Sequence, residues 1–168
     1  MFVTPRASAA TAAATLIAIL AVASPALGQE RAFRSTPAAA TVSASDDAGR
    51  LFEEGKLKDA RAAYVRATNE ARANQEYAKA AFAGLANVQF VLGDIKGAAR
   101  AFDELGERAA AFGDPETEIN ALFNSAVLFA EAGDAKSAAA RVPRLKTLLQ
   151  SPVISENTRR LVAERIAK

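Results

Sequence analysis

The sequence predicts an all-α protein, a solenoid of about three stacked helix-turn-helix hairpins that ends in a C-terminal capping helix. Two observations lead to this fold class. From Ser45 almost to the end, apolar residues follow a helical period, and no stretch alternates as a strand would. A turn-like stretch also occurs three times, as EGKLKDARAAY at 54–64, LGDIKGAARAF at 92–102 and AGDAKSAAARV at 132–142.

The first 28 residues have the layout of a cleaved secretory signal peptide. Arg6 precedes an apolar stretch at 12–23, and the small residues Ala26 and Gly28 stand just before an expected cut at Gln29. The apolar stretch is shorter than the roughly 20 residues that span a bilayer, which argues against the alternative, an uncleaved anchor. We therefore expect a periplasmic or secreted protein of bacterial origin.

Residues 29–45, QERAFRSTPAAATVSAS, are rich in Ala, Ser and Thr and lack a helical period of apolar residues. This composition predicts a disordered linker that spaces the folded part from a membrane or from the export machinery. A peptide ligand for another domain is the alternative. The helical repeat domain is then expected at 46–150 and the capping helix at 151–168.

The three turn-like stretches align on Gly55, Gly93 and Gly133, which are 38 and 40 residues apart. Such intervals are typical of helical-hairpin repeats. Each glycine fits just past the end of a first helix, where a left-handed backbone conformation causes no side-chain clash. The aspartates that follow Gly93 and Gly133 can cap the second helix, whereas the lysine that follows Gly55 cannot.

Small and larger residues recur at the same numbers of positions before and after these glycines. Alanine occurs seven residues before each glycine and five residues after it, at Ala48, Ala86, Ala126, Ala60, Ala98 and Ala138. Nine residues after the glycine stand Tyr64, Phe102 and Val142. The alanines allow two helices to cross closely, and the larger residues lie where they can pack between hairpins. One hairpin cannot bury such a face alone, so the hairpins should stack.

The segment FGDPETE at 112–118 predicts the junction between two hairpins. Gly113 can end one helix, Asp114 can cap the next, and Pro115 fits a first helical position because its missing N–H is not needed there. This explanation accounts for the Gly-Asp-Pro group without a calcium or phosphate site.

Two features mark the C-terminal part. Pro143 lies where the third hairpin should have its second helix, and it predicts a kink near Ala139 because proline removes one hydrogen bond and clashes one turn back. Beyond it, Ser155 can serve as the N-cap of a last amphipathic helix. A terminal helix of this kind keeps the end of a solenoid soluble.

The pattern of small residue, Gly-Asp turn, alanine five residues on and aromatic residue nine residues on resembles the tetratricopeptide repeat family. The units are longer than that family's nominal unit of about 34 residues, so they look like its extended variety. The resemblance covers roughly residues 44–149. It implies a right-handed solenoid whose first helices line a concave groove that binds a protein or a peptide.

The resemblance also implies which residues line the groove. They are Phe52, Asn87, Phe90, Asn120, Phe123 and Asn124. For the phenylalanines, packing between helices is the alternative to contact with a ligand. Asn87 and Asn124 are similar to part of the clamp by which some family members hold a C-terminal carboxylate. Because Ala83 stands where that clamp needs a lysine, we do not expect carboxylate capture.

Composition limits the chemistry that the chain can perform. It has no His and no Cys, and its 21 basic and 19 acidic residues nearly balance, so nothing favours nucleic acid, a metal or another cofactor. No motif of a catalytic site appears. Asp103, Glu104 and Glu107 form a local acidic cluster, which is expected to be a solvated helix face. An enzyme that uses carboxylates would need a deep pocket with raised carboxyl pKa values.

Residues 136–168 contain eight Lys or Arg and two Glu. This basic end could make peripheral contact with an anionic membrane or an acidic partner. The alternative is a solvated cap whose positive charges favour helix C-termini. Together, these features predict an exported, non-catalytic scaffold or adaptor that binds a protein partner. The alternative function is a self-associating structural subunit of an envelope complex.

Overall fold

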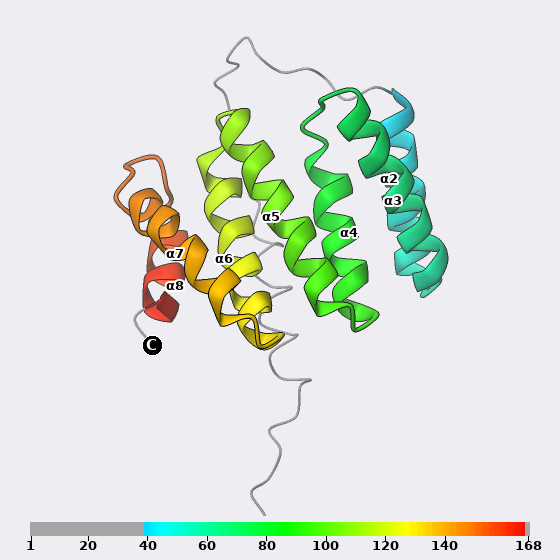
Figure 1. Ribbon diagram of the computed structural model, residues 1–168. Helices are drawn as coiled ribbons and strands as arrows, with labels where there is room; N and C mark the ends of the chain where they lie inside the picture. The colour runs from blue at the N-terminus through cyan, green and yellow to red at the C-terminus, as the bar shows by residue number, and fades with distance from the viewer. Residues whose placement is uncertain (1–38, 167–168) are drawn as a thin grey trace, which may run out of the picture. The chain divides into compact units, whose positions relative to one another are not determined.

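The computed structural model describes residues 39–166, and every regular element within that range is an α-helix. The helices are α2 (Ala39–Glu53), α3 (Leu57–Ala73), α4 (Lys79–Val91), α5 (Ile95–Ala111), α6 (Pro115–Glu131), α7 (Ala135–Leu149) and α8 (Glu156–Ile166) (Figure 1). The all-α class is confirmed for this part of the chain. The expected signal peptide at 1–28 and the first ten residues of the expected linker lie outside the described residues.

Consecutive helices pack against one another and form three hairpins, α2–α3, α4–α5 and α6–α7 (Figure 1). The first helices α2 and α4 are also in contact, and α8 packs against α6 and α7. By contrast, α4 and α6 both pack on α5 but make at most a marginal contact with each other. Helix α5 therefore joins the second and third hairpins.

One type of turn ends four of the helices. Glycines with φ between 72° and 82° follow α2, α4, α5 and α6, at Gly55, Gly93, Gly113 and Gly133. In each case the next amide donates to the carbonyl five residues back, as from Asp94 N to Gln89 O at 2.9 Å, which is the Schellman motif. The expected position of these glycines past helix ends is confirmed.

The expected N-caps are confirmed as well. The carboxylates of Asp94, Asp114 and Asp134 accept from the amide three residues on, at 2.9–3.0 Å. Lys56 precedes α3 without a side-chain cap. At α8, Ser155 Oγ accepts from Thr158 N at 3.2 Å, and the amide and hydroxyl of Ser155 donate to the Glu116 carboxylate of α6 at 3.0 and 2.9 Å. The cap of α8 thus also docks it on α6.

The small and large repeat positions are buried most completely in the first two hairpins. Ala48, Ala60, Ala86 and Ala98 have no exposed surface, and Tyr64 and Phe102 are buried. In the third hairpin the corresponding Ala126, Ala138 and Val142 are only half-buried. The close helix crossing that alanine allows is therefore better developed in the first two hairpins.

One helix boundary differs from the expectation. Helix α2 begins at Ala39, so residues 39–45 are helical although the sequence favoured a linker there. The reason is that this helix buries Thr41, Ser45 and Ala48, small side chains that leave no apolar period to read.

Helix α7 continues through Pro143. Ala139 and Pro143 are both exposed, so water can solvate the carbonyl that proline leaves without a donor. The kink stays a prediction.

The turn after α3 has the same hydrogen bond but lacks the glycine. Glu76 N donates to Ala71 O at 2.8 Å, and the glycine position is occupied by Gln75, with φ 54°. A left-handed conformation costs an L-residue roughly 1–2 kcal/mol, and glycine removes this cost. The greater freedom of glycine in the unfolded chain cancels part of that gain. We predict that Gln75→Gly raises the free energy of unfolding by about 0.5–1 kcal/mol, measured by urea denaturation.

The matched control is Gly113→Gln, which places a side chain at the equivalent position of the α5–α6 turn. A Cβ added at Gly113 would meet no atom within 4 Å, so only backbone strain should act. This variant should lose stability. A Gln75→Gly protein less stable than wild type would contradict the strain that we assign to this turn.

Candidate functional site

The residues expected to line a groove all lie on the first helices of the three hairpins. Phe52 is on α2, Asn87 and Phe90 are on α4, and Asn120, Phe123 and Asn124 are on α6. Phe52, Asn87, Phe90 and Asn120 are half-buried, so part of each side chain is open. Asn120 Nδ2 donates to Glu116 O at 2.9 Å, within its own helix.

Phe123 and Asn124 are enclosed rather than open. Their exposed fractions are 4% and 0%, so a partner would reach them only after a rearrangement. For Phe123 this burial agrees with the packing role that the sequence left as the alternative. Neither amide atom of Asn124 has a hydrogen-bond partner in the described structure. A buried polar group without a partner typically costs about 1–3 kcal/mol.

One side of α4 is not covered by its neighbours. Ala80 and Val91 are exposed, and Ala83, Asn87 and Phe90 are half-buried. Their spacing of three, four and three or four residues places them along one side of the helix. We call these five residues the open face of α4. It is about 17 Å long at 1.5 Å per residue. It consists of small and apolar side chains with one amide.

A tyrosine from the first hairpin supports one border of this face. The ring of Tyr64, on α3, lies against Gly84 of α4, where an added Cβ would be only 2.2 Å from the ring carbons. A Cβ added at Gly49 of α2 would be 3.5 Å from the Tyr64 hydroxyl. Tyr64 therefore extends toward both α2 and α4. Burial, followed by the charges of Glu53 and Asp46, raises the pKa of its phenol.

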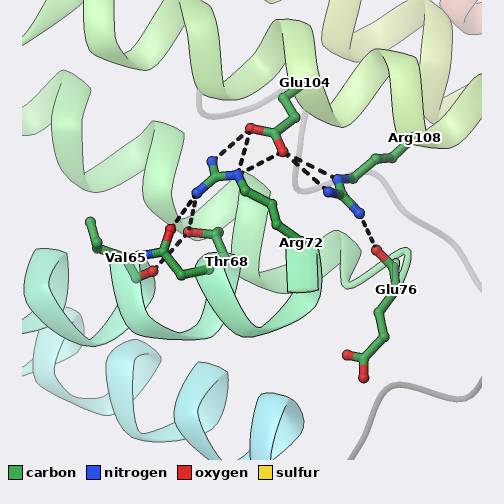
Figure 2. A network of polar contacts seen from close by, with 7 residues as sticks. Val65, Thr68, Arg72, Glu76, Glu104 and Arg108 are labelled. Carbon is green, nitrogen blue, oxygen red and sulfur yellow. Dashed lines mark hydrogen bonds and ion pairs between the residues drawn. The ribbon is translucent and has the colours of Figure 1, made fainter. Parts of the chain in front are cut away.

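The second helices are joined by ion pairs that sequence reasoning missed. Figure 2 shows Glu104 of α5 between Arg72 of α3 and Arg108 of its own helix. Arg72 Nη2 lies 2.6 Å from Glu104 Oε2, and Arg108 Nη1 donates to the main-chain oxygen of Glu76 at 2.5 Å. Both guanidinium groups lie over the ring of the fully buried Phe82, at 5.4 and 4.5 Å from its centroid.

A second bridge of the same kind joins α5 to α7. Arg141 of α7 makes two hydrogen bonds to the Asp103 carboxylate, and its guanidinium lies 4.6 Å from the ring centroid of Phe129 on α6. Asp103 and Glu104 were expected to belong to a solvated face, and this expectation is wrong for both. Only Glu107 of that cluster is exposed. Arg72 and Arg141, which lie 32 and 38 residues from these acids, make the bridges between helices, so local spacing gave no signal of them.

The electrostatics of Glu104 follow from this placement. Burial by itself would raise the pKa of Glu104, but the hydrogen bond and charge of Arg72, with those of Arg108, outweigh it and hold the pKa below its usual value. The hydrogen bonds that Arg72 donates to Glu104 raise the pKa of Arg72. The pair is therefore ionised at neutral pH and links the first two hairpins.

Part of the basic C-terminal segment is engaged within the fold. Arg159 donates to the carbonyls of Leu149, Ser151 and Ile154, and Arg144 is paired with Glu118 of α6. Arg160 and Arg165 are exposed. Contact of this segment with an anionic membrane stays a prediction.

No protein-family model, curated protein or solved structure matches the chain. Between residues 39 and 166, acidic side chains form no group of three that could hold a metal ion. Over the same range, none of the helices combines the length and the apolar character needed to cross a membrane.

The bridge between α3 and α5 can be tested through Glu104. We predict that Glu104→Gln lowers the free energy of unfolding by about 1–2 kcal/mol at neutral pH, because two guanidinium groups lose their shared anion. The folded-state pKa is depressed, so the stabilisation is present above the unfolded-state pKa and is lost as pH falls through the folded value. The difference between wild type and variant should therefore shrink on acidification, measured by urea denaturation over a pH series.

Glu107→Gln is the matched control, because Glu107 is an exposed acid on the same helix. Its effect should be small at every pH. A loss equal to that of Glu104→Gln would indicate a general effect of helix charge instead of the bridge.

The contact between Tyr64 and Gly84 can be tested by adding a methyl group at position 84. We predict that Gly84→Ala destabilises the protein by about 1–3 kcal/mol, because the added methyl overlaps the tyrosine ring. Gly49→Ala is the control, since its Cβ would make only an ordinary contact, and alanine should stabilise α2 by about 0.5–1 kcal/mol. In a Tyr64→Leu background the penalty of Gly84→Ala should disappear. Thermal unfolding that shows additive losses in the double variant would contradict the overlap.

Proposed function

We propose that this protein is an exported, non-catalytic scaffold or adaptor that binds a protein or peptide partner on the first helices of a right-handed, tetratricopeptide-like solenoid. Its expected place is the periplasm or the extracellular space, after removal of residues 1–28. The observation that carries the proposal is the open face of α4, a row of apolar and amide side chains on one of the first helices.

The arrangement of the hairpins supports this proposal. Repeated turns and caps fix the length of each helix, and ion pairs on α5 hold the second helices together. Helix α4 packs on α3, α5 and α2, and the side with Ala80, Asn87 and Val91 is left exposed or half-buried. A rigid scaffold with an open helix face suits recognition of a helix or an extended peptide.

The proposal can be tested by photo-crosslinking from Asn87. The full chain is expressed in its own host with p-benzoylphenylalanine at position 87, and crosslinked products are identified by mass spectrometry. Position 65 is the control, because Val65 is 36% exposed on α3, a second helix. We expect a distinct protein to be crosslinked from position 87 and not from position 65.

The captured protein is then purified and its affinity for the full chain is measured. Asn87→Arg should weaken binding at least about tenfold by placing a desolvated charge in the interface, whereas Val65→Arg should not. Crosslinks that join two copies of this chain would favour the structural, self-associating alternative. Equal capture from both positions would refute the assignment of the open face.

A further inference from the structure

Two acidic residues of α2 lie near Tyr64, whose ring contacts α4 at Gly84. Asp46 and Glu53 are exposed, and among residues 39–166 neither makes an ion pair. They stand three residues before and four residues after Gly49, so all three share one side of α2. The hydroxyl of Tyr64 lies against Gly49 on this same side.

The acids next to them in the sequence, Asp47 of α2 and Glu54 of the turn after it, are different, because their charge is already balanced. Asp47 and Glu54 are both bridged to Arg50, and Lys56 lies 2.8 Å from Glu54. The negative charge that remains available on α2 is therefore that of Asp46 and Glu53. The raised pKa of Tyr64 reflects the proximity of these two carboxylates, after the effect of burial.

The open face of α4, in contrast, offers a partner no charge at all. Residues 80–91 contain no Asp, Glu, Lys or Arg. Lys79, at the first position of α4, lies 3.6 Å from the carboxylate of Asp114. A charged side chain placed on the open face would lose hydration without gaining a counter-ion, whereas an apolar side chain would gain from burial.

We propose that this surface binds a basic amphipathic helix of a partner protein, with the apolar side of that helix on the open face of α4 and its Lys or Arg residues beside Asp46 and Glu53. The inference rests on the proposed function and adds the chemistry of the partner. Apolar contact supplies the area, and the two acids select the charge and orientation of the helix. The acids are exposed, so the selectivity should weaken with salt.

The test uses two labelled helical peptides with identical leucine and alanine faces, one with lysines spaced seven residues apart and one with glutamates at those positions. Their binding to the full chain is followed by fluorescence anisotropy. We expect the lysine peptide to bind at least about tenfold more tightly at low salt, with the preference falling at high salt.

Two double variants then identify the residues responsible for the preference for the lysine peptide. The double variant Asp46→Asn/Glu53→Gln should lose the preference for lysine, whereas the control Asp47→Asn/Glu54→Gln should retain it. Circular dichroism verifies that both variants are folded. Equal binding of the two peptides to wild type, no binding of the lysine peptide, or an equal loss in the control would overturn the inference.

The experiments distinguish a failure of the basic-helix inference from a failure of the proposed function. If position 87 crosslinks a partner but the lysine peptide shows no preference, the open face is a binding site with a different selectivity. If the lysine peptide binds an Asn87→Arg variant as well as wild type, the basic helix does not occupy the open face, and this inference fails whatever the crosslinking shows.

Discussion

Two adjacent carboxylates on α5 connect the second helices of all three hairpins. Asp103 reaches Arg141 of α7, and Glu104 reaches Arg72 of α3. Consecutive residues on a helix point about 100° apart, so one helix can engage a neighbour on each side. Each bridge passes over a buried phenylalanine of the intervening first helix, so charge pairing and aromatic packing reinforce one another. This pairing adds to the packing of α3 on α4 and of α5 on α6, which connects neighbouring hairpins.

The turns impose a second constraint, on the length of the helices. Glycines at 93, 113 and 133 end α4, α5 and α6 at intervals of 20 residues, and an aspartate starts the next helix each time. Helices α5 and α6 are both 17 residues long and end in turns of the same type. With the second helices joined by ion pairs, the apolar open face of α4 remains available. The proposed binding of a partner helix uses this asymmetry between the two sets of helices.

The sequence predicted the local features of this fold well, because their causes are local. A left-handed glycine, a capping aspartate and a proline at a first helical position act within a few residues, and all were found where expected at Gly93, Asp94 and Pro115. The sequence also placed the expected site residues on the first helices. It could not separate the open Asn87 from the enclosed Asn124, because burial depends on which neighbouring helices cover each position.

The sequence by itself determined the helices, their turns and the small residues at which they cross. Only the tertiary structure decided which charges meet, which asparagine stays accessible, and that Asp46 and Glu53 lie near Tyr64 while the acids beside them are neutralised. The physical reason is the separation along the sequence between the residues that interact. Caps and left-handed turns are set by neighbours along the chain, whereas the ion pairs of α5 join residues 32 and 38 positions apart that come together only when the hairpins stack.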